Sequence, residues 1–314
     1  MAKLKLTLPG LYISPLTCFD EEGKIDKFKV KRQLKYVMDV CRPSLLGICA
    51  VEAQEYQFLA DDERENYIRW LAKLVDKRCP TVVGVSHPSY RQSLRLLRVA
   101  EELDASAIQI LIPRRVSGGK PRLVEIREYV EAIATSSSLP VVLYHHPGPG
   151  AELSVDGLLA LAKLPNVAAI KESSRDMRHI GLLLNRVPRG IHVWLGMEAM
   201  LTGLQLGAAG SAMPPPGSGL ARLLLDAFND GDFRRAAEVQ RIMNTIPAQW
   251  FEYGLTAVMK ASMSILDIDC GIPYPPFGTI PDDARRALET FWRSLGREVL
   301  ERVSGRASEK AGIA

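Results

Sequence analysis

The sequence predicts a (β/α)8 barrel, an α/β fold of the TIM-barrel type, followed by a C-terminal helical extension. Eight short apolar runs rich in β-branched residues recur along the chain, with amphipathic segments between them. Runs that are apolar throughout suit strands buried on both faces, as in a parallel sheet covered by helices. Eight strand–helix units favour a barrel over a doubly wound open sheet, which would require a glycine-rich turn after its first strand, where Gly23 stands alone.

The predicted strands are the apolar runs themselves, at 11–16, 45–51, 81–86, 107–112, 140–145, 167–171, 191–195 and 210–213. The predicted helices lie between them, at 26–40, 61–75, 89–103, 122–134, 154–164, 176–187 and 198–206. The second of these opens on Asp61-Asp62-Glu63, and negative charge is favourable at a helix N-terminus. Ser154 is a suitable N-cap for the helix that follows it.

The last part of the chain contains more helix than one barrel unit requires. Helices are predicted at 220–229, 233–245, 255–266 and 282–302, interrupted by the proline-rich segment 271–281. We therefore expect the barrel at 1–218, and the last barrel helix with a helical extension at 219–303 in the same structural unit. The small, polar residues 304–314 are expected to be a disordered tail.

Composition and charge bound the possible functions. With 40 Lys and Arg against 36 Asp and Glu, the net charge is +4, which is too small and too dispersed to indicate nucleic-acid binding. The five cysteines form no C-x-x-C pair and lie mostly among apolar residues, as free thiols of a reducing compartment do. No signal peptide and no run long enough to cross a membrane is visible, so we expect a cytoplasmic protein.

The candidate chemistry lies at the end of the predicted strand 167–171, where Lys171 follows an apolar run. Active sites of such barrels are built at the C-terminal ends of the strands. Burial lowers the pKa of a lysine towards neutrality, and a neutral amine can attack a ketone to form a Schiff base. The alternative interpretation is a lysine that pairs with Glu172 or reaches to the solvent from a strand end.

Tyr144 ends the preceding predicted strand. Neighbouring parallel strands lie about 5 Å apart, so the phenol can reach a substrate bound to Lys171 and can shuttle protons there. The alternative is an aromatic residue at the barrel rim whose hydroxyl is bonded to the backbone.

Four motifs, in order, carry a resemblance to a known family. They are Thr17-Cys18-Phe19-Asp20-Glu21-Glu22-Gly23-Lys24-Ile25-Asp26, the segment 55–64, Tyr144-His145-His146-Pro147, and Lys171-Glu172-Ser173-Ser174-Arg175-Asp176. On these the chain resembles the dihydrodipicolinate synthase/N-acetylneuraminate lyase superfamily of class I aldolases and lyases. The resemblance implies a 2-oxo acid bound covalently to Lys171, with Tyr144 as the general acid and base.

The chain departs from the family pattern at the substrate end. The family loop Gly-Thr-Thr-Gly-Glu reads Val51-Glu52-Ala53-Gln54-Glu55 here, so the hydroxyl relay is missing, although the amides of Ala53 and Gln54 could still hold a carboxylate. The synthase's Pro-Tyr-Tyr is Pro113-Arg114-Arg115, and its carboxylate-binding arginine is Pro149. These changes argue against dihydrodipicolinate synthase itself.

Further substrate-binding residues are predicted around the pocket. Arg114 and Arg115 could bind an acidic or phosphorylated substrate, and the alternative is a solvated loop pair. The full predicted set is Thr17, Ala53, Gln54, Arg114, Arg115, His145, Ser211 and Met213.

The pair His145-His146 does not indicate a metal site, because consecutive residues of a strand point to opposite faces. One of them, or His87, is instead a candidate acid or base in place of the missing hydroxyls. No metal and no other cofactor is implied.

The sequence therefore predicts a Schiff-base lyase or aldolase that acts on a 2-oxo acid of the pyruvate type, with an aldehyde as a further substrate or product. The alternatives are a 2-oxo-3-deoxy acid dehydratase of the same family and a non-catalytic protein that binds 2-oxo acids. From the resemblance we also expect a homo-oligomer, either a tetramer or a dimer.

Overall fold

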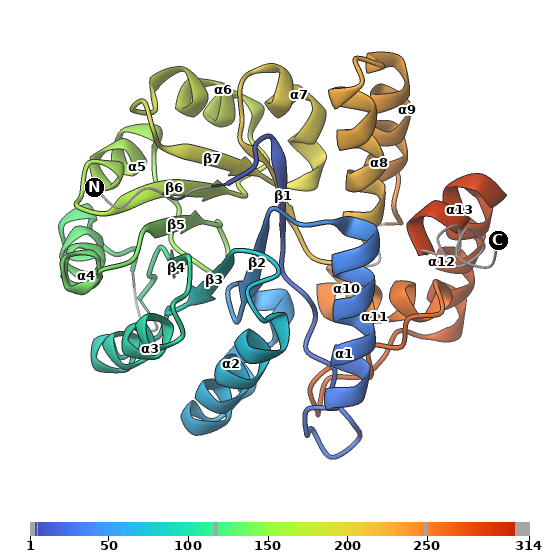
Figure 1. Ribbon diagram of the computed structural model, residues 1–314, viewed down its shortest axis with the longest axis horizontal. Coiled ribbons are helices and arrows are strands. Elements are labelled where there is room, and N and C mark those ends of the chain that lie inside the picture. Colours follow the sequence, from blue (N-terminus) through green and yellow to red (C-terminus); the bar gives the residue numbers. More distant parts are fainter. Residues whose placement is uncertain (1–3, 5, 116–118, 248–249, 305–314) are drawn as a thin grey trace. The chain divides into compact units, whose positions relative to one another are not determined.

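The computed structural model describes residue 4 and residues 6–115, 119–247 and 250–304. Eight strands pair in sequence order and close into a parallel barrel (Figure 1). The predicted (β/α)8 barrel with C-terminal helices is thus confirmed. The strands are β1 Gly10–Ile13, β2 Leu45–Ile48, β3 Thr81–Gly84, β4 Ala107–Leu111, β5 Val141–His145, β6 Val167–Glu172, β7 His192–Leu195 and β8 Gly210–Met213.

Each strand overlaps a predicted apolar run, but β1 ends at Ile13 and not at Leu16, and β2 also ends earlier than expected. The run was predicted to continue to Val51, whereas the strand stops at Ile48 because Cys49 adopts a φ of 49°, outside the extended region. A short 3-10 turn, η2 Glu52–Gln54, follows directly. This early turn determines where Glu52 lies.

Helices cover the outside of the barrel strands (Figure 1). They are α2 Asp61–Val75, α3 Tyr90–Glu102, α4 Leu123–Ser136, α5 Val155–Ala162, α6 Met177–Arg186 and α7 Met200–Gln205, the last preceded by the 3-10 turn η4 Met197–Ala199. The Ser154 hydroxyl accepts a hydrogen bond from the Gly157 N–H, as expected of an N-cap. Asp176 caps α6 by accepting from the N–H groups of Arg178 and His179.

The remaining helices lie near the start and the end of the chain. They are α1 Lys27–Tyr36 with the π-turn η1 Val37–Cys41, then α8 Gly217–Asn229, α9 Phe233–Asn244, α10 Trp250–Tyr253, α11 Leu255–Ile265, α12 Asp282–Ser294 and α13 Arg297–Ser304. The single helix predicted at 282–302 is two helices, because Gly296 between them has a φ of 79°. No helix within the described ranges is long and apolar enough to span a bilayer.

The barrel interior is packed with apolar side chains from many strands. Trp194 and Tyr12 meet edge to face with ring centroids 6.1 Å apart, and the Tyr12 hydroxyl donates to Gln109 Oε1 at 2.8 Å. They belong to a buried cluster with Leu4, Leu45, Val82, Ala107, Val142, Ala168, Ala169, Ala209 and Ala212. A filled interior leaves the strand ends as the place for chemistry.

Closure of the barrel depends on a glycine at the start of β8. Gly210 has a φ of 143°, and a Cβ there would overlap the carbonyl oxygen of Gly10. The backbone at Gly10 is joined to the same segment by its N–H, which donates to the Ala209 oxygen at 3.0 Å. Only a residue without a Cβ allows β1 to approach this closely.

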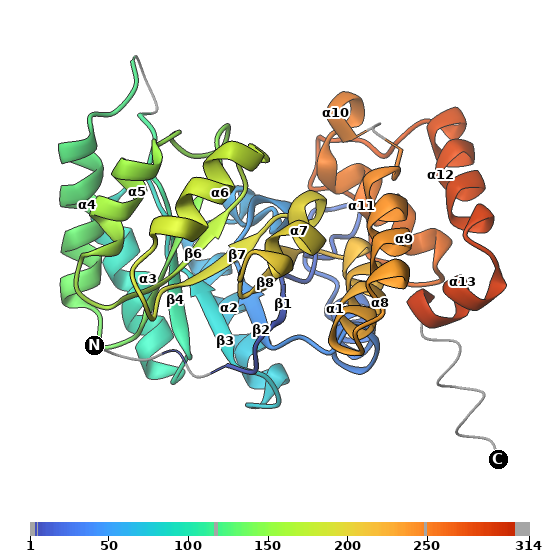
Figure 2. The ribbon, with the colours of Figure 1, turned by 90° about the horizontal axis from the view of Figure 1, so that it is seen from above.

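The chain forms two compact units. The first comprises 1–12, 44–52 and 60–212 and holds nearly all of the strands with α2–α7; the second comprises 13–43, 53–59 and 213–314 and holds α1 and α8–α13. Within the second unit α8 and α9 run side by side in both views (Figures 1 and 2). The boundary predicted at 218 stays a prediction, and the predicted tail lies, from residue 305 on, outside the described residues.

Candidate active site

Lys171 is a buried amine near the C-terminal end of β6. Its side chain is 4% exposed. Burial lowers its pKa from 10.5 to about 7, although the negative charges of Glu52 and Glu172 act to raise it. A substantial fraction of this lysine is therefore neutral and nucleophilic at physiological pH.

The Lys171 amine lies on the face of the Tyr144 ring. The register of β5 and β6 pairs the two residues directly, and Nζ is 3.3 Å from the ring centroid. An aromatic face attracts an ammonium group without giving it a hydrogen-bond acceptor that must later be displaced. The amine is thus held in position beside a phenol.

The Tyr144 hydroxyl contacts two side chains that could carry a proton. It donates to Glu52 Oε2 at 3.1 Å and lies 2.8 Å from Nδ1 of His146. Nδ1 of His146 is in turn 3.6 Å from Glu52 Oε2. The hydroxyl is therefore part of a side-chain network at the site, and Glu52 belongs to it although no sequence motif predicts a role for this residue.

Glu52 enters this network from η2, immediately after the early end of β2. Burial raises the pKa of its carboxyl, but the neighbouring imidazole of His146 and the charge of Lys171 outweigh burial and hold the pKa below its ordinary value. Its second oxygen, Oε1, is buried and has no hydrogen-bond donor among the described residues. The Glu52 carboxylate thus accepts a hydrogen bond from the phenol through Oε2, while Oε1 accepts none from the described residues.

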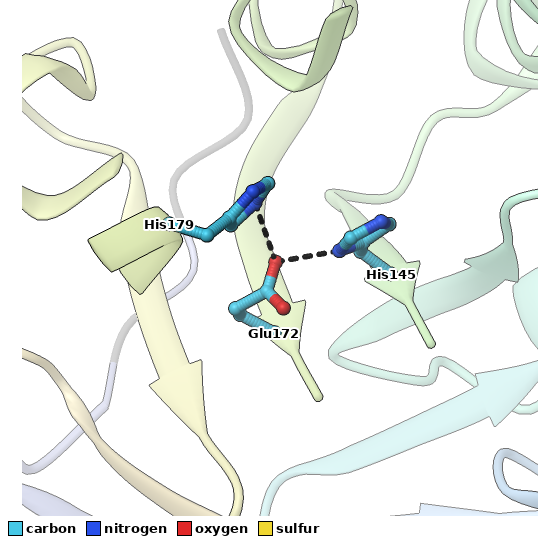
Figure 3. Close-up of side chains that lie close together, drawn as sticks. All are labelled: His145, Glu172 and His179. Atoms are coloured by element: carbon cyan, nitrogen blue, oxygen red, sulfur yellow. Dashed lines mark hydrogen bonds and ion pairs between the residues drawn. The ribbon is translucent and has the colours of Figure 1, made fainter. Parts of the chain in front are cut away.

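On the opposite face of the same two strands lies a second polar cluster, formed by His145, Glu172 and His179 (Figure 3). Nδ1 of His145 is 2.7 Å from Glu172 Oε2, and Nε2 of His179 is 3.4 Å from the same oxygen. Burial would raise the pKa of Glu172, but the two imidazoles outweigh it and hold the pKa at about 2. Glu172 is therefore engaged by these histidines, and among the described residues it forms no ion pair with Lys171.

The hydrogen bonds of this cluster fit a direct contact between His145 and Glu172 better than a metal site. Ligand atoms of the three residues lie within 4.8 Å of one another. However, the Leu153 N–H donates to Nε2 of His145 at 3.0 Å, which leaves the ring proton on Nδ1, facing Glu172. A cation at this point would need the lone pair that this proton occupies. His146, and not His145, is the histidine that contacts the Tyr144 hydroxyl.

Other predicted site residues in the first unit form hydrogen bonds or ion pairs with residues other than Lys171 and Tyr144. The Ser211 hydroxyl donates to the Leu195 carbonyl at 2.9 Å. Arg114 is exposed and donates to the Gly148 carbonyl, and Arg115 is exposed and pairs with Glu125 at 2.6 Å. His87 accepts from the Ser89 N–H, and its Nε2 lies 3.4 Å from Asp61. The exposure of the two arginines is compatible with the solvated loop pair, and their role in binding substrate stays a prediction.

The predicted residues Thr17, Ala53, Gln54 and Met213 belong to the second unit. All are buried, and the Thr17 hydroxyl donates to the Gln54 carbonyl at 2.6 Å. The segment 53–59 is held further by Glu55, which binds Lys260 at 2.7 Å and accepts from the Tyr274 N–H at 2.8 Å. Their role in binding substrate stays a prediction.

A parallel barrel with a buried lysine beside a tyrosine at its strand ends is the arrangement expected of Schiff-base lyases and aldolases. The dihydrodipicolinate synthetase family matches residues 7–294, and the chain belongs to that family. It is 26% identical over 281 residues to 4-hydroxy-tetrahydrodipicolinate synthase of Bacillus subtilis, covering 88% of this chain and 95% of the relative. It is 27% identical over 296 residues to an uncharacterized DapA-like lyase of Halobacterium salinarum, covering 93% and 95%.

Solved structures share the fold at lower identity. A dihydrodipicolinate synthase of Bacillus anthracis has a TM-score of 0.84 at 23% identity, covering 93% of this chain and 100% of its own. YagE of Escherichia coli K12, a prophage protein of the dihydrodipicolinic acid synthase family in complex with pyruvate, has a TM-score of 0.83 at 23% identity, covering 91% and 98%.

Proposed function

We propose that this protein is a class I lyase or aldolase that binds a 2-oxo acid of the pyruvate type as an imine on Lys171. The observation that carries the proposal is the Lys171 amine, buried, with a pKa of about 7, on the face of the Tyr144 ring. A similar protein of the family, YagE, has been solved in complex with pyruvate, which supports this class of substrate.

The chemistry follows from the two side chains. The neutral Lys171 amine attacks C2 of the 2-oxo acid, forming the C–N bond and moving the carbonyl electron pair onto oxygen. Tyr144 passes the amine proton to that oxygen, which then leaves as water after taking up one further proton. The resulting iminium withdraws electrons from C3, so that a bond at C3 can be made or broken.

The substrate differs from that of dihydrodipicolinate synthase in this proposal. Pro149 stands where the synthase has its carboxylate-binding arginine, and the pocket loop offers Glu52 and Ala53 in place of two hydroxyls. Without that bidentate clamp a second substrate carboxylate has no matched partner, and Glu52 would repel it. A neutral group beyond C3 of the 2-oxo acid fits this site better.

Borohydride trapping tests the proposal. The wild-type protein is incubated with pyruvate, 2-oxobutyrate or 2-oxoglutarate, reduced, digested and analysed by mass spectrometry. We expect a 2-oxo acid-dependent adduct on Lys171, absent from Lys171→Ala and retained in Lys163→Ala. Wild type without an adduct from any of these acids would overturn the proposal, and reversible binding of these acids without an imine would show a binding protein instead.

We further infer, from the family, that the protein is a homo-oligomer, a tetramer or a dimer. Arg114 and Arg115 stand where the synthase has a tyrosine that reaches a neighbouring subunit, so each active site would be complete within one chain. Sedimentation velocity should show a dimer or tetramer, and a monomer at all concentrations would contradict this inference.

A further inference from the structure

A carboxylate and an imidazole meet at the Tyr144 hydroxyl, and imine formation between Lys171 and a 2-oxo acid does not by itself use either of them. Glu52 Oε2 and His146 Nδ1 lie 3.1 Å and 2.8 Å from the phenolic oxygen. We propose that Glu52 and His146 form a proton relay that acts through Tyr144, storing the proton that the reaction takes up and releases. This inference rests on the proposed function, since it assumes an imine on Lys171.

The number of available protons gives the network a direction. The Tyr144 hydroxyl has one proton, and an ionised Glu52 can only accept. The hydroxyl therefore donates to Glu52, as the geometry shows. The contact with His146 is then satisfied only if Nδ1 carries a proton and donates to the phenolic oxygen. The hydrogen bonds thus run from His146 through Tyr144 to Glu52.

Such a chain balances the protons of the reaction. When the carbinolamine hydroxyl leaves, the C–O bond breaks and the oxygen takes one proton from Tyr144. His146 replaces that proton through its Nδ1 and becomes neutral, which requires that the ring also holds a proton on Nε2 when the step begins. When the C3–H bond then breaks to form the enamine, the electron pair moves into the C2–C3 bond. The proton passes through Tyr144 to Glu52 or back to His146, so none is gained or lost over the two steps.

The position of Glu52 supports a role beyond that of an anchor for the phenol. An anchor needs a single acceptor, yet the carboxylate keeps Oε1 buried without a donor among the described residues. Leaving a buried carboxylate oxygen unpaired costs free energy, which a substrate hydroxyl or the departing water can recover. An imidazole can also hold a full proton near neutral pH, and a carboxylate takes up a proton far more readily than a hydroxyl oxygen does.

The test separates imine formation from proton transfer at C3, with pyruvate as the probe. The variants are Glu52→Gln, which keeps the shape and an acceptor for Tyr144, Glu52→Asp, and His146→Asn. Matched controls are Glu128→Gln, an exposed carboxylate of α4, and His192→Asn, at the opposite end of β7. Each is assayed for the borohydride-trapped adduct on Lys171 and, by NMR in deuterium oxide, for exchange of the pyruvate methyl hydrogens.

We expect E52Q and H146N to form the adduct but to exchange the methyl hydrogens at least about 100-fold more slowly than wild type. E52D should recover part of the exchange, and both controls should match wild type. The pH profile of exchange should change shape in H146N, whereas a merely structural defect would lower the whole profile without changing its shape.

Two results would overturn the relay while leaving the proposed function intact. One is exchange at the wild-type rate in both E52Q and H146N. The other is loss of the adduct together with exchange in folded variants, which would mean that the two residues serve to position Lys171. If wild type itself shows neither adduct nor exchange, the proposed function fails, and the relay fails with it.

Discussion

At Lys171, burial and charge act in opposite directions on one amine. Burial lowers the pKa to about 7 against the pull of two carboxylates. Since only the neutral amine attacks a carbonyl, imine formation with pyruvate should rise about tenfold per pH unit below pH 7 and level off above it. Measuring the trapping rate from pH 5 to pH 10 checks this. An inflection near the ordinary pKa of lysine would show that the pKa of the Lys171 amine is not lowered.

Tyr144 offers a second prediction at the scale of the residue. Tyr144→Phe keeps the aromatic face that holds the amine but removes the hydroxyl that meets Glu52 and His146. The exchange of pyruvate methyl hydrogens should fall roughly 100-fold to 10,000-fold, since this is what a positioned acid and base contributes. A variant that exchanges as fast as wild type would remove the phenol from the mechanism.

The sequence was enough to predict that Lys171 and Tyr144 lie side by side, because strand ends and neighbouring positions follow from the pattern of a parallel barrel. It was not enough for Glu52. The place of this side chain depends on the positive φ at Cys49, which ends β2 early, and on the 3-10 turn Glu52–Gln54, which no periodicity indicates. For His145-His146, strand alternation places His146 on the same face as Tyr144, a consequence that the prediction of opposite faces left undrawn. The substitution of Glu52 for a family hydroxyl was the signal that could have been used.

At the scale of the element, Glu172 joins β6 to β5 and α6. Its carboxylate contacts His145 and His179, and its other oxygen accepts from the Ser174 N–H at 2.6 Å. Glu172→Gln should lower the free energy of unfolding by about 3 kcal/mol, because it removes a buried carboxylate that accepts charge-assisted hydrogen bonds from His145 and the Ser174 N–H. Urea denaturation, with E128Q as the exposed control, measures this, and an equal midpoint for the two would contradict it.

The same carboxylate predicts a pH dependence of stability. Its pKa falls from 4.5 to about 2 on folding, so its contribution is present above pH 4.5 and is lost as the pH falls towards 2. Wild type should therefore lose more stability than E172Q between these values. Denaturation at pH 5 and pH 3 tests the difference, and parallel losses in both proteins would exclude Glu172 as the titrating group.

At the scale of the whole molecule, closure of the barrel requires that β8 and β1 approach without a side chain between them. Gly210→Ala places a Cβ against the Gly10 carbonyl. It also requires an L-amino acid to adopt a φ of 143°, which such residues rarely do. We expect a loss of about 3 kcal/mol in unfolding free energy. Gly181→Ala, in the middle of α6 with nothing near its Cβ, should instead stabilise by about 0.5–1 kcal/mol. Relative to wild type, the midpoint of thermal unfolding should fall in Gly210→Ala and rise in Gly181→Ala.

The backbone contact at His145 has a spectroscopic consequence. Because the Leu153 N–H fixes the tautomer, the Nδ1 proton of His145 is enclosed between an imidazole and a carboxylate with the side chain fully buried. Such a proton exchanges slowly with water and resonates far downfield of the amides. It gives a natural NMR probe on β5, hydrogen-bonded to Glu172 of the strand that carries Lys171. Imine formation on one face of β6 can therefore be followed from the other face without any label at the site.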